Sequence, residues 1–264
     1  MSTLAVRRLT PTSLADVIDD GPDVGATITD AHRHALAARF RAVAIDRHRR
    51  LDAWSVERAG RGSPPFRWSP ATARRLIGNA ALGRVADGVR TPRLGVELEI
   101  ADLRARAETG RTRPGSLGSW LADRHPAELA VVHAAAADWA TTLAEIGAGL
   151  GTSWRVARAD AYYDVERART TLRARRDLIV ATDAAVVRVR GGHPSSSAGA
   201  GLRADLVAAT FARADGRAPR RYVGVWPDAG LVVAVDGSMD NLRAGARDLV
   251  RTAVVQRRQW LRAA

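Results

Sequence analysis

Alternating apolar and polar residues concentrate in the second half of the chain, between Trp154 and Asp236. Runs such as Leu-Ile-Val and Ala-Val-Val-Arg-Val are rich in β-branched residues, which is typical of strands. A Pro-Asp-Ala-Gly turn between two later runs predicts a hairpin. We therefore expect the sheet of this protein here, with Tyr162 and Tyr163 in or beside a turn. The expected strands cover residues 153–158, 168–182, 184–190, 222–226 and 231–235.

Elsewhere the apolar positions recur every three or four residues, which predicts helices. Ser69 followed by Pro70 favours a helix start, because the N–H that proline lacks would have no partner in a first helical turn. Residues 94–100 alternate like a strand, but the Arg, Ala and Glu residues that follow favour a helix. The expected helices cover residues 12–20, 29–58, 80–108, 116–124, 126–150 and 203–214, one segment from Ser69, and one from Ser238 or Asp240.

This order of elements predicts a mixed α/β protein in an α+β arrangement. A helical N-terminal half is expected to precede a small mixed sheet flanked by helices. Residues 1–65 are expected to form an N-terminal arm and helix, ending in a Gly-Arg-Gly-Ser-Pro-Pro break. Residues 66–264 are expected to form one α/β domain, with a helical part over 66–150 and a sheet part over 151–264. The acidic residues 1–30 are interpreted as a peripheral arm.

The composition excludes several kinds of site. The chain has no cysteine, which rules out disulfides, thiolate zinc sites, iron–sulfur clusters and a cysteine nucleophile. Its N-terminus lacks the apolar run of a signal peptide, and no stretch approaches the ~20 apolar residues of a membrane span. We therefore expect a cytoplasmic protein with no membrane partner.

The formal charge of +13 indicates a polyanionic partner, with DNA as the first candidate. All 41 basic residues are arginine, and the chain contains no lysine. Schiff-base chemistry, a P-loop lysine and a catalytic ammonium group are therefore excluded. In the final helix, Arg243, Arg247 and Arg251 are spaced four apart and are expected to line one face.

Four motifs follow one another in an order that resembles the RecB-like nucleases of the PD-(D/E)XK superfamily, over about residues 66–255. The helix start Trp-Ser-Pro-Ala-Thr is similar to the serine-containing helix opener of that family. A Gly-Ser-Leu-Gly-Ser-Trp-Leu segment follows where the family often carries a glycine and a histidine. The resemblance implies that Asp177, in Arg-Arg-Asp-Leu-Ile-Val, corresponds to the metal-binding aspartate. The segment Val186–Gly192 lies where the family has an acid-x-Lys motif and a glycine turn.

The departures from the family pattern bear on activity. Such a nuclease holds Mg²⁺ between two carboxylates and uses a lysine beside the attacking water. Here Arg188 stands in place of the second acid and Arg190 in place of the lysine. Arginines around a lone carboxylate pair with it and repel a divalent cation. We therefore expect a pseudoenzyme on a degenerate nuclease fold, with no cofactor, in which Asp177 is a catalytic relic or pairs with a neighbouring arginine.

The same arginines are expected to form a basic surface in the cleft where the family threads DNA. Two alternate along one predicted strand and two along the next, so that each pair shares a face. The expected nucleic-acid-binding residues are Arg173, Arg175, Arg176, Arg188, Arg190, Arg243 and Arg247. The expected function is that of a DNA-binding accessory to repair, recombination or defence.

Two alternatives stay open. The protein could be an active, divergent nuclease that binds Mg²⁺ or Mn²⁺ through Asp177 together with Asp183, Asp205 or Glu166. It could instead be a non-catalytic subunit whose arginines dock a helicase or another acidic repair protein.

Overall fold

The computed structural model describes residues 4–9, 11–59, 67–150, 152–157, 159–181 and 185–263. The chain divides into two compact units, and the mixed α/β class expected from the sequence is confirmed. The sheet unit comprises Met1–Ser63 and Gly149–Ala264, and the helical unit comprises Pro64–Ala148. The division differs from the predicted one, because the N-terminal residues belong with the sheet part and the predicted helical part forms a unit of its own.

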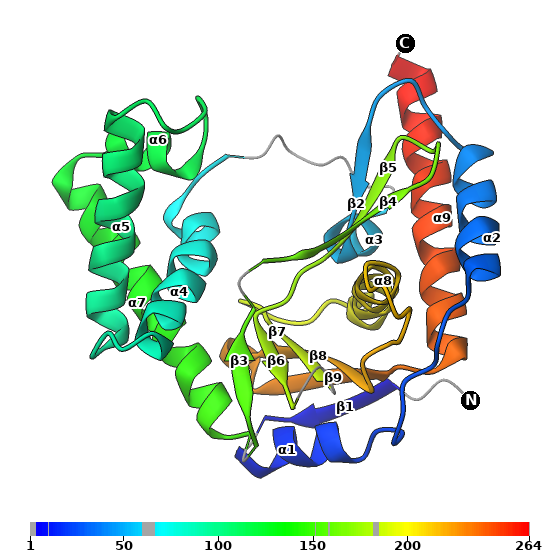
Figure 1. Ribbon diagram of the computed structural model, residues 1–264, viewed down its shortest axis with the longest axis horizontal. Helices are drawn as coiled ribbons and strands as arrows, with labels where there is room; N and C mark the ends of the chain where they lie inside the picture. Colours follow the sequence, from blue (N-terminus) through cyan, green and yellow to red (C-terminus); the bar gives the residue numbers. More distant parts are fainter. Residues whose placement is uncertain are drawn as a thin grey trace. The chain divides into compact units, whose positions relative to one another are not determined.

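The main sheet of the sheet unit has six strands in the order β1-β9-β8-β7-β6-β3 (Figure 1). Strands β3, β6 and β7 pair antiparallel, although the chain leaves this sheet between β3 and β6, and helix α8, Ala198–Phe211, then crosses over from β7 to β8. The β7–β8 pair is parallel, and the remaining pairs are antiparallel. The strands are β1 (Leu4–Arg8), β3 (Trp154–Val156), β6 (Leu178–Val180), β7 (Ala185–Val189), β8 (Arg221–Trp226) and β9 (Leu231–Asp236). A short 3-10 turn, η1 (Pro227–Ala229), joins β8 to β9, so the predicted hairpin is confirmed.

A second sheet has three strands in the order β2-β5-β4. Strand β2 (Arg49–Leu51) runs parallel to β5 (Thr170–Ala174), which is antiparallel to β4 (Ala161–Val165). The single strand predicted over residues 168–182 is therefore wrong, because its first half pairs in this sheet as β5 and its second half in the main sheet as β6. The two tyrosines expected beside a turn lie in β4 instead.

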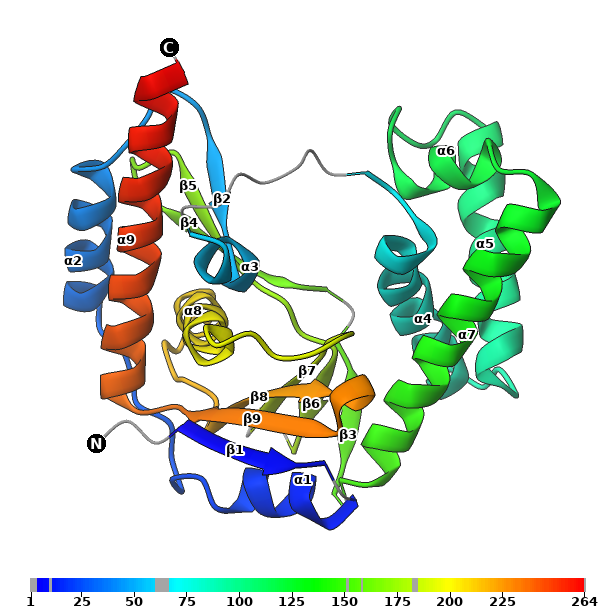
Figure 2. The ribbon, with the colours of Figure 1, turned by 180° about the vertical axis from the view of Figure 1, so that it is seen from behind.

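Helix α8 lies at the centre of the sheet unit, between the main sheet and the C-terminal helix α9, Met239–Ala263 (Figures 1 and 2). Twelve of its fourteen residues are buried, which its run of small and apolar residues permits. A Cβ on Gly245 of α9 would lie 2.4 Å from the carbonyl oxygen of Arg203. Glycine is required there because the two helices cross at backbone contact distance.

The N-terminal residues are integrated into the sheet unit. Strand β1 pairs with β9, and helix α1 (Pro11–Asp19) confirms the predicted short helix. The expectation of a peripheral arm is wrong, since β1 forms an edge of the main sheet. The helix predicted over 29–58 is also interrupted: α2 (Asp30–Arg41) is followed by β2 and by α3 (Ala53–Glu57). Pairing of β2 with β5 overrides the helical periodicity there.

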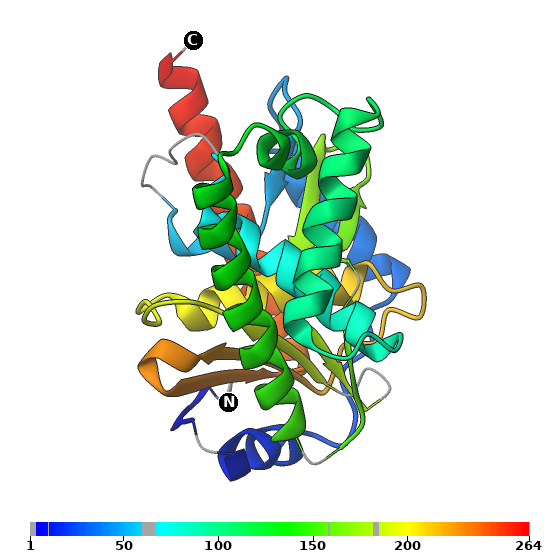
Figure 3. The same cartoon turned by 90° about the vertical axis from the view of Figure 1, so that its left-hand side faces the viewer.

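The helical unit consists of α4, α5, α6 and α7, of which α4, α5 and α7 pack side by side (Figure 3). Ser69 caps α4 as predicted, and the alternating residues 94–100 lie in a helix. The helices are α4 (Pro70–Ala86), α5 (Pro92–Glu108), α6 (Leu117–Ala122) and α7 (Pro126–Ala148). Within the described part of the chain, no helix is both long and apolar enough to cross a membrane.

Two helical glycines of this unit provide a matched test of its packing. A Cβ on Gly95 would lie 2.7 Å from the carbonyl oxygen of Ala81, whereas a Cβ on Gly83 meets nothing within 4 Å. Gly95→Ala should therefore lower the free energy of unfolding by about 1–3 kcal/mol through overpacking of α5 on α4. Gly83→Ala should raise it by about 0.4–1 kcal/mol through lower unfolded-state entropy. Urea denaturation checks both, and equal effects of the two substitutions would contradict the close helix contact.

Candidate functional site

Asp177 lies in the link between β5 and β6 and is fully buried. Its carboxylate accepts a hydrogen bond of 2.8 Å from the backbone N–H of Val189, and its own N–H donates to the carbonyl of Val187 at 3.0 Å. The Asp177 carbonyl in turn accepts from the N–H of Ala157, next to β3. This aspartate therefore ties β3 and β7 together at the end of β6.

Arg188 projects from β7 towards helix α8, where it pairs with Asp205. Both side chains are buried; Arg188 donates to Asp205 Oδ2, and Asp205 Oδ1 has no hydrogen-bond partner among the described residues. Burial raises the pKa of Asp205 to about 6, against the opposing effect of the Arg188 guanidinium. The position expected to correspond to the family's second acid thus holds one half of an internal ion pair.

Arg190 forms a two-pronged pair with Glu57 of α3 and lies 5.1 Å over the ring of Trp226. The second guanidinium nitrogen lies 2.7 Å from Glu57 Oε2. A planar guanidinium held by two parallel hydrogen bonds and an aromatic face is fixed in position, unlike a solvated side chain. Arg190 is therefore committed to an internal contact.

The arginines on and after β5 also meet carboxylates and carbonyls. Arg173 lies 2.8 Å from Asp160 and 3.9 Å from Asp52. Arg175 lies 3.8 Å from the same Asp52, and Arg176 donates to the carbonyl of Ala159 at 2.8 and 3.2 Å. The expectation that the two pairs of arginines lie on neighbouring strands is wrong, because β5 and β7 belong to different sheets.

Five arginines and five carboxylates of this region form what we call the neutral network. The five charges of each sign cancel, so the network presents no formal net charge. Sequence reasoning missed Asp52, Glu57 and Asp160, which approach their arginines across 13 to 133 residues of chain, and no local motif marks them. The members are Arg173, Arg175, Arg176, Arg188, Arg190, Asp52, Glu57, Asp160, Asp177 and Asp205.

The residues around Asp177 do not fit a divalent cation. Such a site needs several oxygen ligands without competing cations, and Asp205, one proposed second ligand, is taken by Arg188. Glu166, another, lies in the β4–β5 turn, half exposed and 3.5 Å from Arg167. Asp183 lies outside the described residues. Among the residues that are described, no group of three or more His, Asp or Glu side chains is placed to hold a metal ion.

The arginines of α9 contrast with the neutral network. Arg243 and Arg247, both expected from the sequence to bind a polyanion, are exposed. The ion pair of Arg243 with the equally exposed Asp240 is long, at 4.0 Å. Asp240 is the one exposed acid among the described side chains of this helix. We call the six exposed arginines the α9 arginine face: Arg243, Arg247, Arg251, Arg257, Arg258 and Arg262.

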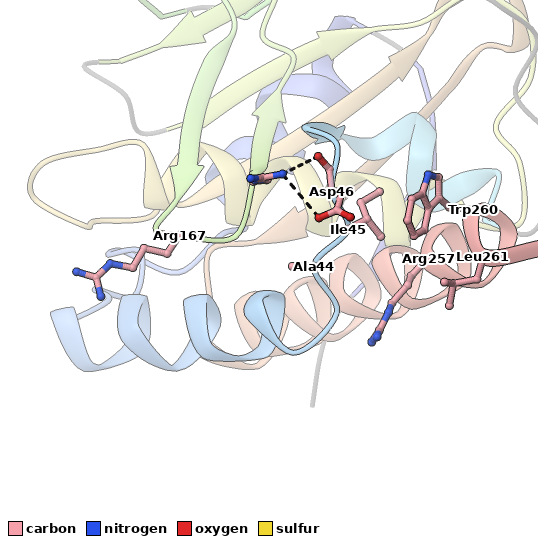
Figure 4. A pocket seen from close by; sticks show the side chains of 8 residues that line it. Ala44, Ile45, Asp46, Arg167, Arg257, Trp260 and Leu261 are labelled. Carbon is pink, nitrogen blue, oxygen red and sulfur yellow. Dashed lines mark hydrogen bonds and ion pairs between the residues drawn. The ribbon is translucent and has the colours of Figure 1, made fainter. Parts of the chain in front are cut away.

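A cavity of about 240 Å³ lies beside the C-terminal end of this face (Figure 4). Arg257, Trp260 and Leu261 of α9 line it on one side. The β4–β5 turn and the segment after α2 contribute the rest: Ala44, Ile45, Asp46, Arg167 and Arg169. No sequence motif indicated this cavity, because its three segments are far apart in the chain.

The Arg188–Asp205 pair can be tested by comparing one substitution with two. Arg188→Met leaves the Asp205 carboxylate buried without a counter-charge and should cost about 3–5 kcal/mol of stability. Adding Asp205→Leu removes the stranded charge and should restore stability to the native value or above it. Hydrogen exchange of the β7 amides measures both variants, and a double variant no better than the single one would contradict a buried pair.

The same pair predicts a pH dependence. With a folded-state pKa of about 6, raised above that of the unfolded chain, Asp205 binds its proton more tightly in the folded protein. Its contribution to the free energy of unfolding therefore rises as the pH falls from about 6 to 4. Urea denaturation across this window should show that contribution in the wild type and not in Arg188→Met/Asp205→Leu. Identical profiles would rule it out.

Comparison with known proteins finds no relative. No protein-family model matches the chain, no curated protein is significantly similar to it, and no solved structure matches its fold. The function must therefore be inferred from the geometry and charge of this chain alone.

Proposed function

We propose that this protein binds DNA or RNA without sequence preference, through the α9 arginine face, on a scaffold related to RecB-like nucleases but without nuclease chemistry. The observation that carries the proposal is the contrast between two sets of arginines. Four of the five in the neutral network meet carboxylates and Arg176 meets the Ala159 carbonyl, whereas the six on α9 are exposed beside one exposed acid among the described residues of that helix.

The spacing of these arginines suits a regularly charged polymer. Separations of four, four, seven and four residues keep five of them on one side of a helix. The helix has 25 residues and is therefore about 37 Å long. A nucleic-acid strand placed along it would bring several of its phosphates within reach of these arginines. Guanidinium groups contact phosphates without reading bases, so the expected affinity depends on salt rather than on sequence.

The order of elements supports the proposed scaffold. Strands β3, β6 and β7 pair antiparallel, a crossover helix α8 and further strands come next, and helix α9 closes the chain, in the order that the family resemblance implies but with β4 and β5 of the second sheet inserted between β3 and β6. Asp177 lies at the start of β6 and the two arginines that replace the acid and the lysine lie on or beside β7. Their internal pairing favours a non-catalytic role, and we propose an accessory to repair, recombination or defence.

Neutralising part of the α9 arginine face tests the proposal. Arg243→Gln/Arg247→Gln/Arg251→Gln should weaken binding to a fluorescent duplex and to a single strand alike. The slope of log K against log salt should fall by about 0.9 for each duplex phosphate that the variant no longer neutralises. Fluorescence anisotropy between 50 and 200 mM salt, conditions in which phosphate binding depends strongly on salt, measures it.

The helical unit offers a control of equal charge. Arg90, Arg93 and Arg106 are exposed there, so their triple substitution by glutamine removes the same net charge. If both triple variants weaken binding equally, the effect is one of overall charge and not of the α9 arginine face. If the wild type does not bind, the proposal is overturned. Incubation of the wild type with Mg²⁺ or Mn²⁺ should leave the DNA uncut; cleavage that disappears in Asp177→Ala would establish the nuclease alternative instead.

A further inference from the structure

The β4–β5 turn contains two arginines in an unusual backbone conformation. Arg167 has a φ of 55° and Arg169 a φ of 46°, in the left-handed region that favours glycine. A left-handed backbone is disfavoured by steric contact of the Cβ, and such positions cluster at functional sites. Here the strained turn brings two cations to one wall of the cavity beside α9.

The opposite wall of this cavity is supplied by α9. Trp260 projects from the helix towards Ile45, whereas the Arg257 side chain extends away from Ile45 and Asp46 and donates to the carbonyl of Ala42 (Figure 4). The lining therefore combines one aromatic side chain with three arginine residues, of which Arg169 contacts Asp46 while Arg167 and Arg257 extend away from Trp260 (Figure 4). Its volume of about 240 Å³ is smaller than the roughly 300–1,000 Å³ of pockets for drug-sized ligands, so it admits one nucleotide-sized group rather than a large cofactor.

Positive charge at this cavity exceeds negative charge. Asp46 is the one carboxylate among the described lining residues and is 94 % exposed; Arg169 lies 3.9 Å from its carboxylate and donates to its carbonyl at 2.6 Å. Arg167 is 82 % exposed, and the nearby Glu166, 3.5 Å from it, is not among the lining residues. Arg257 donates one hydrogen bond to the carbonyl of Ala42, which leaves its other N–H groups available to a ligand.

A buried cation next to the cavity adds to this excess. Arg49 of β2 is 6 % exposed and bonds to neutral groups, the Thr170 hydroxyl and the Ala253 carbonyl. Its Nη2 has no partner among the described residues. Burial, and then the positive charge of Arg257, lower the pKa of Arg49. An anion bound at Arg257 would offset that repulsion.

We propose that this cavity binds one nucleotide of a single-stranded nucleic acid, with its base against Trp260 and its phosphate on Arg257 and the turn arginines. The inference rests on the proposed function and adds a binding mode to it. A base in a duplex is stacked on both faces and cannot reach the indole ring, whereas an unpaired base can. The C-terminal end of the α9 dipole opposes an anion here, but several guanidinium groups outweigh its partial charge.

The test is a binding measurement on two probes. Trp260→Ala should weaken binding of a fluorescent oligothymidine about 5- to 150-fold, the range that corresponds to the ~1–3 kcal/mol of a base stacked on an aromatic side chain. Trp260→Phe keeps a ring and should keep most of the affinity. Neither substitution should change binding of a fluorescent hairpin duplex. An oligonucleotide with abasic positions should bind the wild type more weakly than the intact one and should not distinguish the Trp260 variants.

Arg167→Gly separates binding from folding. Glycine accepts the left-handed backbone, so the thermal midpoint should not fall, while the salt slope for the single strand should fall by about 0.7, the value for one phosphate. If the wild type binds both probes but Trp260→Ala, with a native thermal midpoint, binds oligothymidine unchanged, the cavity inference is overturned and the proposed function stands. If the wild type binds neither probe, the proposed function falls too.

Discussion

The buried ion pair between Arg188 and Asp205 is the constraint on which the sheet unit depends. Removing two charges from water costs several kcal/mol for each ion, and that cost is recovered only if the charges meet in good geometry. Strand β7 and helix α8 must therefore pack in the one register that joins guanidinium and carboxylate. The Asp177 carboxylate then ties down the end of the same strand through Val189, and Glu57 fixes α3 against it through Arg190.

Arginine serves two opposite purposes in this chain. In the neutral network its fork of donors joins strands and helices to carboxylates, and the charges cancel there. Along α9 the same side chain is exposed with little opposing charge nearby. A metal-dependent nuclease needs carboxylates that are free to bind a cation, whereas here Asp205 pairs with Arg188 and Asp177 accepts from the backbone N–H of Val189. The arrangement is thus compatible with a protein that binds a polyanion at its surface while its interior arginines are engaged in internal contacts.

Much of the fold could be predicted from periodicity and from helix caps. The central helix α8, the closing helix α9, the β8–β9 hairpin and the helical character of the helical unit follow from local patterns, although the helix expected over 80–108 is divided between α4 and α5. The errors share one cause. Strand β2 has a helical pattern in the sequence, but it pairs with β5. The segment 168–182 has the pattern of one strand, but it is divided into β5 and β6, which pair in two different sheets. Local propensity is weak beside a hydrogen-bonded ladder.

The sequence by itself determined that the chain is strongly basic, carries no lysine or cysteine, and has an arginine stripe on its last helix. Those properties depend only on residue type and helical spacing. The tertiary structure decided which arginines are exposed and which are paired. The carboxylates that pair with arginines of the neutral network come from α3, α8 and the segment before β4, which are separate segments of the chain. The cavity beside Trp260 was decided in the same way, since three distant segments meet there. Burial and pairing depend on contacts across the fold, and these leave no local trace in the order of residues.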